Sequence, residues 1–329
     1  MVKMVIAMRK DIDMGRGKIA AQAAHAAVAC TLLSMKKNKK VFNAWYSLGQ
    51  KKVVVKVDNV EEIYKTLTLN TQLDNKSLER TLISLYISGF DTLAIRSFNY
   101  INDEIRATIK KFSKLVIGIE IFEEDSKKIV LQNVLNSSSY PVYNSIKRMS
   151  LNVESMIYDV IKGIDEDDAE LLKNVINRDD EIDRFQWYIY REVKSKGNDD
   201  NNIFYLLLSR ILERIADHAV NLCDIWTNRK LIIEIPSSKM VENLTYSLDL
   251  FKRAIALFYA RKYIGLNDII STKKNIMTQK KELLGLGNSS DIATVSSSSE
   301  EISRIGLYST DIAELAMDMV LSMNNEITL

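Results

Sequence analysis

The stretch RILERIADH, residues 210–218, sets two acidic residues four positions apart within a run of helical periodicity. Four residues make just over one helical turn, so Glu213 and Asp217 project from the same face of a helix. An earlier helical stretch carries a second pair with the same spacing, Asp179 and Asp183. If the two helices are antiparallel neighbours, the four carboxylates converge. The sequence therefore predicts a helical bundle with one acid-lined face.

Converging carboxylates predict a bound cation. A cluster of like charges removed from water is costly unless an opposite charge neutralises it. Sites made of carboxylates suit Mg, Mn or Fe better than metals that prefer thiolates. His218 would add a nitrogen ligand and favour Fe or Zn. The candidate metal ligands are Asp179, Asp183, Glu213 and Asp217.

A structural interpretation of the same residues stays open. The acidic residues of 180–183 are also compatible with a solvated helix face, and Glu213 with an ion pair to Arg210 or Arg214. The spacing alone does not choose between a metal site and ordinary surface charge pairs.

Beyond Pro141 the sequence predicts only helices. Long stretches rich in Leu, Ile, Lys and Glu with helical periodicity favour helix, and Gly, Asn and Pro residues mark the breaks. Six helices in two sets of three suggest an internal duplication, with repeats at 141–228 and 238–324. The expected helices are 141–164, 167–196, 201–228, 238–263, 267–285 and 299–324.

The two expected repeats differ where the acids lie. Their alignment places Ser303 opposite Glu213 and Leu307 opposite Asp217. An acid-dependent site is therefore expected in the first repeat and lost or altered in the second. The serine run at 296–299 is expected to cap the last helix.

Charge and cysteine usage restrict the class of protein. The 329 residues, 47% of them hydrophobic, are enough for two or three packed domains. Residues 1–66 hold 13 Lys and Arg against 5 Asp and Glu, whereas the remainder holds 32 against 38. A basic first part suggests a polyanionic partner and an acidic remainder suggests cation binding, although surface solvation also accounts for both.

Two distant cysteines exclude a disulfide framework. The absence of a long apolar run or signal peptide predicts a cytoplasmic protein with no membrane span.

The first 136 residues mix strands with helices. Residues 1–66 are expected to form an α/β module, residues 67–76 a linker, and residues 77–136 a small α+β unit. The module's expected elements are strands at 4–8 and 53–57, an Ala-rich helix at 18–33 and a helix beginning at 59–65. Those of the α+β unit are a helix at 77–88 capped by Asn75 or Ser77, a strand at 92–96, a helix at 102–112 and a hairpin of 115–122 with 128–134.

Residues from about 74 to the C-terminus resemble the PhoU family in its archaeal form, where an α+β segment precedes the helical domain. The resemblance rests on segments that include SLER at 77–80, GIEIFEE at 118–124, RDDEIDR at 178–184 and LERIADHA at 212–219. It implies two three-helix bundles, metal ions held by the four acidic residues, and negative regulation of phosphate uptake. The implied partners are a phosphate transporter's ATPase and a phosphate-responsive signalling protein.

Residues 1–66 resemble the peptidyl-tRNA hydrolase of archaea and eukaryotes. The segments that carry the resemblance include KMVI at 3–6, MGRGK at 14–18, AAQ at 20–22 and QKKVVVKV at 50–57, together with His25 and Trp45. It implies hydrolysis of the ester bond between peptide and tRNA. The candidate catalytic residues are Lys18, Gln22 and His25.

The chemistry of this segment is compatible with an RNA end. Gly15 and Gly17 would let the backbone approach a ligand at a helix N-terminus, where free N–H groups favour a phosphate or a developing oxyanion. Lys18 adds a positive charge there. His25 would serve as a base or fix the helix, and both roles stay open. The candidate contacts to the tRNA backbone are Arg16, Lys36, Lys37, Lys39 and Lys40.

The hydrolase pattern stops after residue 66, where that family continues with further strands and an active-site loop. Two strands alone would have to borrow partners from the 92–134 unit or from another subunit, so we expect a homo-oligomer. The expected fold is mainly α, with two PhoU-like three-helix bundles preceded by a small α+β unit and a partial hydrolase-like α/β module. We expect a metal-binding regulator of phosphate uptake, with an active peptidyl-tRNA hydrolase as the alternative.

Overall fold

The computed structural model describes residues 4–9, 16–47, 52–57, 64–69, 74–135, 141–196, 200–229, 237–286 and 292–323. The chain divides into two compact units, Met1–Tyr64 and Lys65–Leu329. The features predicted at Gly15, at Gly197 and at Pro236 lie outside the described residues.

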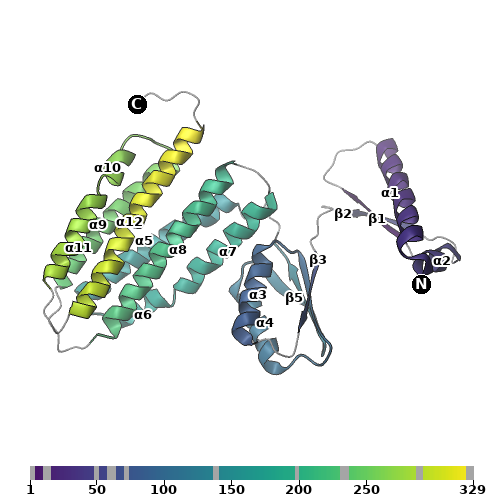
Figure 1. The fold of residues 1–329 in the computed structure, drawn as a ribbon, viewed down its shortest axis with the longest axis horizontal. Coiled ribbons are helices and arrows are strands. Elements are labelled where there is room, and N and C mark those ends of the chain that lie inside the picture. Colours follow the sequence, from purple (N-terminus) through teal and green to yellow (C-terminus); the bar gives the residue numbers. More distant parts are fainter. Residues whose placement is uncertain are drawn as a thin grey trace. The chain divides into compact units, whose positions relative to one another are not determined.

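The N-terminal unit is a βαβ arrangement (Figure 1). Its elements are β1 (Met4–Arg9), α1 (Arg16–Lys37), α2 (Lys39–Ser47) and β2 (Lys52–Val57). The two strands pair in parallel, with Met4 opposite Lys52, as expected where helices connect consecutive strands. Met4, Ile6 and Trp45 are buried and form a small core. Both predicted strands are present.

The described strands of this unit form a sheet of their own. Within the described residues, β1 and β2 form a two-stranded sheet, and the strands of the 92–134 unit belong to a separate four-stranded sheet. Pairing of β1 or β2 with strands of the 92–134 unit stays a prediction, and so does pairing with another subunit.

The four-stranded sheet begins inside the segment predicted as a linker. Strand β3 (Tyr64–Leu69) hydrogen-bonds to β4 (Thr92–Ser97), so the predictions of a linker at 67–76 and a helix running to residue 65 are wrong at these positions. The reason is an alternation along YKTLTL, in which Tyr64, Thr66 and Thr68 are exposed while Leu69 enters the core.

Two helices and a hairpin complete the α+β unit. The elements are α3 (Asn75–Ile87), α4 (Asp103–Leu115), β5 (Ile119–Glu124) and β6 (Lys128–Asn133), and the strand order is β3-β4-β6-β5. Asp74 caps α3, because its carboxylate accepts a hydrogen bond from the Ser77 backbone N–H at 2.9 Å. The predicted caps, Asn75 and Ser77, are therefore wrong by one and three residues. The predicted hairpin is confirmed as an antiparallel pair.

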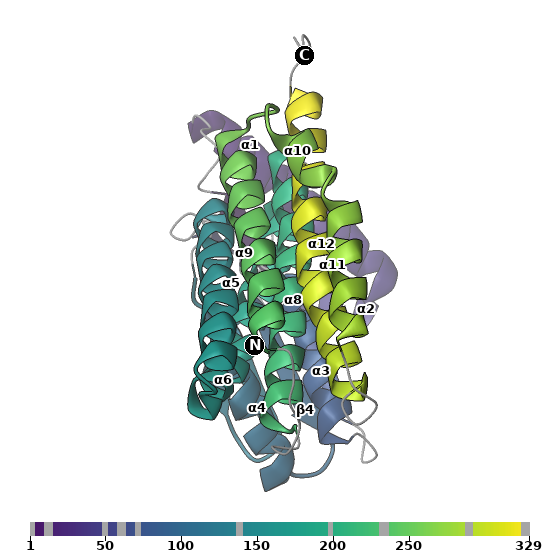
Figure 2. The same ribbon diagram turned by 90° about the vertical axis from the view of Figure 1, so that its left-hand side faces the viewer.

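Beyond Pro141 the described residues contain only helices, as predicted. The helices are α5 (Val142–Asp165), α6 (Ala169–Ile176), α7 (Asp179–Lys196), α8 (Asp200–Thr227), α9 (Ser237–Ala260), α10 (Leu266–Ile270), α11 (Lys273–Gly285) and α12 (Ile292–Met323). The four long helices contact one another in a ring, in the order α5, α8, α12, α9 (Figures 1 and 2). The pair α6–α7 packs on α5 and α8, and the pair α10–α11 packs on α9 and α12. Each repeat thus supplies a long helix, a broken helix and a second long helix to one shared core.

Three helix boundaries differ from the prediction. The segments predicted as single helices at 167–196 and 267–285 each break once, after Ile176 and after Ile270. The last helix begins at residue 292 rather than 299. The serines at 296–299 therefore lie inside α12, where the Ser299 hydroxyl donates to the Ser296 carbonyl at 2.8 Å instead of capping the helix.

A buried arginine joins α7 to the α+β unit. Arg191 is 4% exposed, and its guanidinium donates to the backbone carbonyls of Tyr86 at 3.1 Å and Phe90 at 2.7 Å. It also lies over both aromatic rings. Trp187, one turn earlier on α7, packs against the same core. One face of α7 is thereby fixed to the α+β unit.

Replacing this arginine should loosen the contact. Arg191→Met removes the guanidinium donor from the Phe90 carbonyl and leaves the Tyr86 carbonyl with only the Gly89 N–H at 3.0 Å. We expect the free energy of unfolding to fall by roughly 2–3 kcal/mol, as measured by urea denaturation followed by circular dichroism. Arg253→Met is the control, since Arg253 is exposed and forms only a 3.5 Å surface pair with Asp249. That variant should change stability by less than about 0.5 kcal/mol, and equal effects of the two substitutions would contradict this account.

Candidate metal-binding site between two helices

Helices α7 and α8 pack side by side and carry the four predicted metal ligands. Asp179 and Asp183 lie in the first two turns of α7, and Glu213 and Asp217 lie near the middle of α8. All four side chains are half-buried. The four carboxylates lie close enough to repel one another. Burial and then this repulsion raise the pKa of both aspartates of α7.

The two aspartates of α7 titrate near neutral pH. Burial raises the pKa of Asp183 to about 7, and repulsion from Asp179 and Glu213 adds to the effect. Burial, followed by repulsion from Asp217, raises the pKa of Asp179 to about 6. Carboxyl groups displaced this far from their ordinary value gather at functional sites.

The two acids of α8 are partly compensated. Burial raises the pKa of Glu213 and of Asp217, and the cations of Arg210 and Arg214 act in the opposite direction. Arg210 Nη1 lies 3.7 Å from Glu213 Oε1, and Arg214 Nε lies 3.8 Å from Oε2, distances too long for hydrogen bonds. Glu213 Oε2 is buried without a hydrogen-bond partner. The ion pairs of Glu213 with Arg210 and Arg214, which the structural interpretation predicts, are therefore long and include no hydrogen bond.

The remaining acids of the motif do behave as surface charges. Asp180 is exposed, and Glu181 accepts a hydrogen bond from Arg148 at 3.1 Å. Asp183 differs from both, since it faces the other carboxylates and makes no ion pair in the described part of the chain. The solvated-face interpretation therefore holds for residues 180 and 181 and not for residue 183.

The acids do not form a preformed coordination shell. In the described ranges, no three His, Cys, Asp or Glu side chains are gathered into a set that could hold a metal ion. The donors nevertheless suit a hard cation, since they are carboxylate oxygens and one of them, Glu213 Oε2, is buried and unpartnered. Side-chain rotation would be needed to bring three of them onto one ion.

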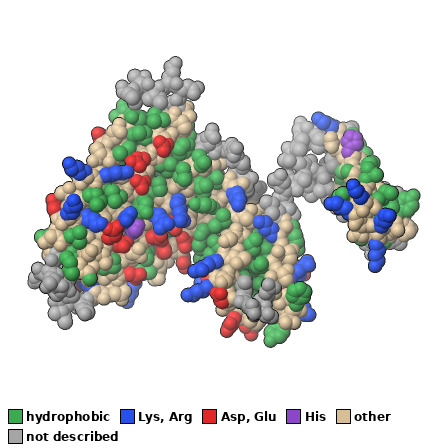
Figure 3. Space-filling model, in the orientation of Figure 1, with side chains coloured by type: hydrophobic (Ala, Val, Ile, Leu, Met, Phe, Trp, Pro, Cys, Tyr) green, Lys and Arg blue, Asp and Glu red, His purple; other side chains and the backbone are tan. Residues whose placement is uncertain are grey.

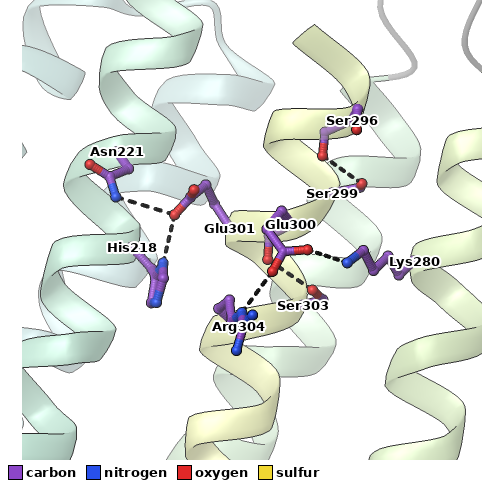
Figure 4. A network of polar contacts seen from close by, with 9 residues as sticks. All are labelled: His218, Asn221, Lys280, Ser296, Ser299, Glu300, Glu301, Ser303 and Arg304. Atoms are coloured by element: carbon purple, nitrogen blue, oxygen red, sulfur yellow. Dashed lines mark hydrogen bonds and ion pairs between the residues drawn. The ribbon is translucent and has the colours of Figure 1, made fainter. Parts of the chain in front are cut away.

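His218 points to α12 rather than to the acid cluster. Its Nδ1 lies 2.6 Å from Glu301 Oε2, and the Asn221 amide donates to the same oxygen at 3.4 Å (Figure 4). The imidazole also stacks on Tyr308. His218 thus connects α8 to α12, the long helices of the two repeats. The sequence had suggested instead that it adds a nitrogen ligand to the acid cluster.

The second repeat neutralises its acids with lysines. Lys280 of α11 pairs with Glu300 of α12, and Arg304 Nε donates to the same carboxylate at 2.7 Å (Figure 4). Lys273, also on α11, lies 2.6 Å from Glu314 and 3.6 Å from Asp311. Acidic and basic side chains accordingly alternate across the face of the helical domain in Figure 3. Among the described side chains of α7, no lysine pairs with an acid of α8.

The predicted catalytic residues lie on one helix of the N-terminal unit. Lys18, Gln22 and His25 are four and three residues apart, so they share one face of α1, and all three are exposed. The exposure of His25 gives no support to a packing role. Among the described residues of this unit there is no Asp or Glu.

The predicted RNA contacts lie at the two ends of α1 and at the start of α2. Lys36 and Lys37 end α1, Lys39 and Lys40 begin α2, and all four are exposed. Arg16 begins α1, but its side chain lies outside the described atoms. At 1.5 Å per residue, Lys37 is roughly 28 Å along the helix from Lys18. The basic run is therefore separate from the candidate catalytic face.

Comparisons with known proteins find a similarity for each of two parts of the chain. The family model for peptidyl-tRNA hydrolase PTH2 matches residues 2–84, and that for the PhoU domain matches residues 146–225. Residues 2–84 are therefore similar to peptidyl-tRNA hydrolases of the PTH2 type, and residues 146–225 are similar to PhoU domains. The PTH2 match extends past the predicted end at residue 66 into β3 and α3.

Residues of the N-terminal part are similar to peptidyl-tRNA hydrolases of two Thermoplasma species. The peptidyl-tRNA hydrolase of Thermoplasma volcanium is 65% identical over 63 residues, which cover 19% of this chain and 54% of that protein. The peptidyl-tRNA hydrolase of Thermoplasma acidophilum is 67% identical over 61 residues, covering 18% and 52%. The chain thus spans about half the length of these relatives.

The chain also resembles a solved structure in its fold. PhoU from Pseudomonas aeruginosa matches with a TM-score of 0.51 over 55% of this chain and 96% of that protein, at 18% identity. A likeness at this identity shows a shared fold. Within the described residues, no helix is both long and apolar enough to cross a membrane.

Three residues near the site were not predicted from the sequence. Arg191 is buried against the α+β unit, Arg184 has a buried Nε without a hydrogen-bond partner, and Glu301 holds His218. Arg184 and Arg191 are seven residues apart, so a helical projection of α7 would have placed them together. Glu301 gave no comparable signal, because its partner comes from a helix distant in sequence.

The raised pKa values predict an unusual pH dependence. Between about pH 4 and 7 the folded protein keeps protons on Asp179 and Asp183 that the unfolded chain releases, so the free energy of unfolding should decrease as pH rises through this range. We expect Asp183→Asn to remove roughly 1–2 kcal/mol of that decrease after allowance for solvent screening. The measurement is urea unfolding in EDTA at a series of pH values.

A matched substitution separates this effect from a general loss of charge. Asp318→Asn removes an exposed aspartate from the second repeat. The free energy of unfolding of this variant should depend on pH as that of the parent protein does. The same pH slope in Asp183→Asn and in the parent protein would show that the aspartates of α7 are not the source.

Proposed function

We propose that the PhoU domain is a metal-dependent regulator of phosphate uptake or signalling, and that the PTH2-type segment serves it as a docking or dimerisation module. The observation that carries the proposal is the pair of half-buried aspartates whose pKa values lie near 6 and 7 between α7 and α8. A helix pair with this much uncompensated acidity is suited to a cation.

The site's residues have distinct roles in this proposal. Asp183 of α7 and Asp217 of α8 are the ligands that would join the two helices, and neither forms an ion pair with a described residue. Asp179 and Glu213 would be the other two ligands. Glu213 Oε2 is buried without a hydrogen-bond partner, and a bound cation would supply one. A bound Mg, Mn, Fe or Zn ion would supply the positive charge that lysines supply in the second repeat.

Cation binding would change the contact between α7 and α8. Without a cation, repulsion between the two helices is relieved only by protonation or by separation of the carboxylates. A bound cation would hold the two helices together. The resulting position of α7 would affect the α+β unit through the hydrogen bonds of Arg191. The partners we propose, a phosphate transporter's ATPase or a phosphate-responsive signalling protein, rest on the PhoU resemblance.

The proposal predicts metal loading that depends on both helices. Full-length protein dialysed against Mn²⁺ and then against metal-free buffer should retain metal by mass spectrometry, whereas Asp183→Asn/Asp217→Asn should retain less than about a tenth of that amount, since a site missing two of four charged ligands loses most of its affinity. The control Asp268→Asn/Asp318→Asn removes two exposed aspartates of the second repeat. Equal retention by all three proteins would contradict the proposal.

A second function is favoured by the N-terminal unit itself. Over 63 residues the chain is 65% identical to a peptidyl-tRNA hydrolase, and Lys18, Gln22 and His25 share an exposed face of α1. Lys18 in the first turn of that helix would add to the positive potential of the helix N-terminus, where a developing oxyanion is stabilised. We infer that ester hydrolysis is possible only if the missing half of the hydrolase fold is supplied by another copy of the chain.

Turnover of an N-blocked aminoacyl-tRNA by the full-length protein tests this second function. An active enzyme should lose about 100-fold or more in kcat in Lys18→Ala, whereas Lys37→Ala, about 28 Å along the helix, should mainly raise KM. A folded protein that gives no turnover would contradict the hydrolase function and leave the metal-dependent regulator as the role of the chain.

A further inference from the structure

A cavity of about 500 Å³ opens between α7 and the α+β unit. On the α7 side it is lined by Arg184, which lies seven residues before the buried Arg191 and so shares its face of the helix. The other walls come from α4, from β5 and from the segment between them. Its volume falls within the range of small-molecule sites, about 300–1,000 Å³.

The polar lining of this cavity is mainly basic. Lys110, Lys114 and Arg184 line it, against one acidic residue, Glu120. Lys110 is partly neutralised by Glu124 at 3.2 Å. Lys114 and Arg184 make no ion pair with any described residue. The cavity therefore presents positive charge that the described protein does not neutralise.

Arg184 is the residue that most clearly lacks a partner. Its Nε is buried from solvent and donates to no acceptor among the described residues. A guanidinium presents paired N–H donors in a plane, an arrangement that matches the oxygens of a phosphoryl group. Lys114 can contribute a second charge, because it lies in the last turn of α4 at the same cavity.

We propose that this cavity binds a phosphoryl group, held by Arg184 and Lys114. The proposal goes beyond the metal-dependent function and does not depend on it, because the residues that carry it are not metal ligands. The phosphoryl group would be either free inorganic phosphate or the phosphate of a small phosphorylated molecule.

A neighbouring cavity allows for the larger of these ligands. It has a volume of about 290 Å³, and it shares Ile117 and Arg184 with the first. Leu135 and Phe185 give it an apolar wall, and Arg148 and Glu181 line it as well. Arg148 lies over the Phe185 ring at 5.3 Å from the centroid. A phosphorylated molecule could place its phosphate at Arg184 and its apolar part beside Phe185.

The position of the cavity would couple it to the acid cluster. Arg184 directly follows Asp183 on α7, so an anion that orders Arg184 acts on the same helical turn that carries the acid. Any effect of anion binding on cation affinity must be matched by an equal effect of the cation on anion affinity.

Isothermal titration calorimetry of the full-length protein tests the proposal. The protein is treated with EDTA and dialysed, so that phosphate cannot bind through a metal ion, and is titrated with inorganic phosphate, AMP, ATP and sulfate. We expect one saturable site for phosphate or for a nucleotide, with affinity at least 10-fold lower in Lys114→Gln/Arg184→Gln. Tighter binding of phosphate identifies the free ion as the ligand, and tighter binding of a nucleotide identifies a phosphorylated molecule.

A matched variant controls for the loss of charge. Lys147→Gln/Lys274→Gln removes two exposed lysines that line neither cavity and should bind as the parent protein does. If the first double variant does not fold, Lys114→Gln alone carries the test, with a several-fold loss expected. Absence of saturable binding, equal binding by the cavity variant and the parent protein, or sulfate binding as tight as that of every phosphate probe would overturn the proposal.

Discussion

Repulsion between carboxylates held by two packed helices is the constraint on which the C-terminal unit depends. Phe185 of α7 and Leu212 of α8 belong to the shared core, and burying each contributes roughly 1.5–3 kcal/mol. This packing brings four acids together and partly removes them from water, which raises the pKa of Asp183 to about 7. Protonation relieves the repulsion in acid, and a cation is the remaining means of relief near neutral pH.

The two repeats meet this constraint in different ways. In the second repeat, Lys273 and Lys280 of α11 pair with acids of α12, so neutralisation is built into the chain. In the first repeat, α7 carries aspartates instead of such lysines. Its arginines have other contacts: Arg191 binds the α+β unit and Arg184 lines a basic cavity. Helix α7 therefore contacts an acid cluster on one face and a basic cavity on another, which makes it the element through which the two could influence each other.

Local patterns were sufficient to predict most elements and the acid pairs, because helical spacing and short apolar strands are properties of neighbouring residues. They failed at Tyr64–Leu69, where a period-two pattern of alternating Thr and Leu was short enough to pass for a linker. They also failed at Ser296–Ser299, whose serines pack inside α12 rather than cap it. Contacts between distant segments, such as His218 with Glu301 and Arg191 with Phe90, have no local signature and required the fold.

The most direct test of a cation between α7 and α8 is the position of the ion itself. Crystals of the full-length protein grown with Mn²⁺ and measured at the manganese absorption edge would locate it by anomalous scattering. The account predicts a peak within coordination distance, about 2.0–2.6 Å, of carboxylate oxygens from both helices, Asp183 on one side and Asp217 on the other. A well-ordered structure with no peak there, or with manganese bound only elsewhere, would contradict it.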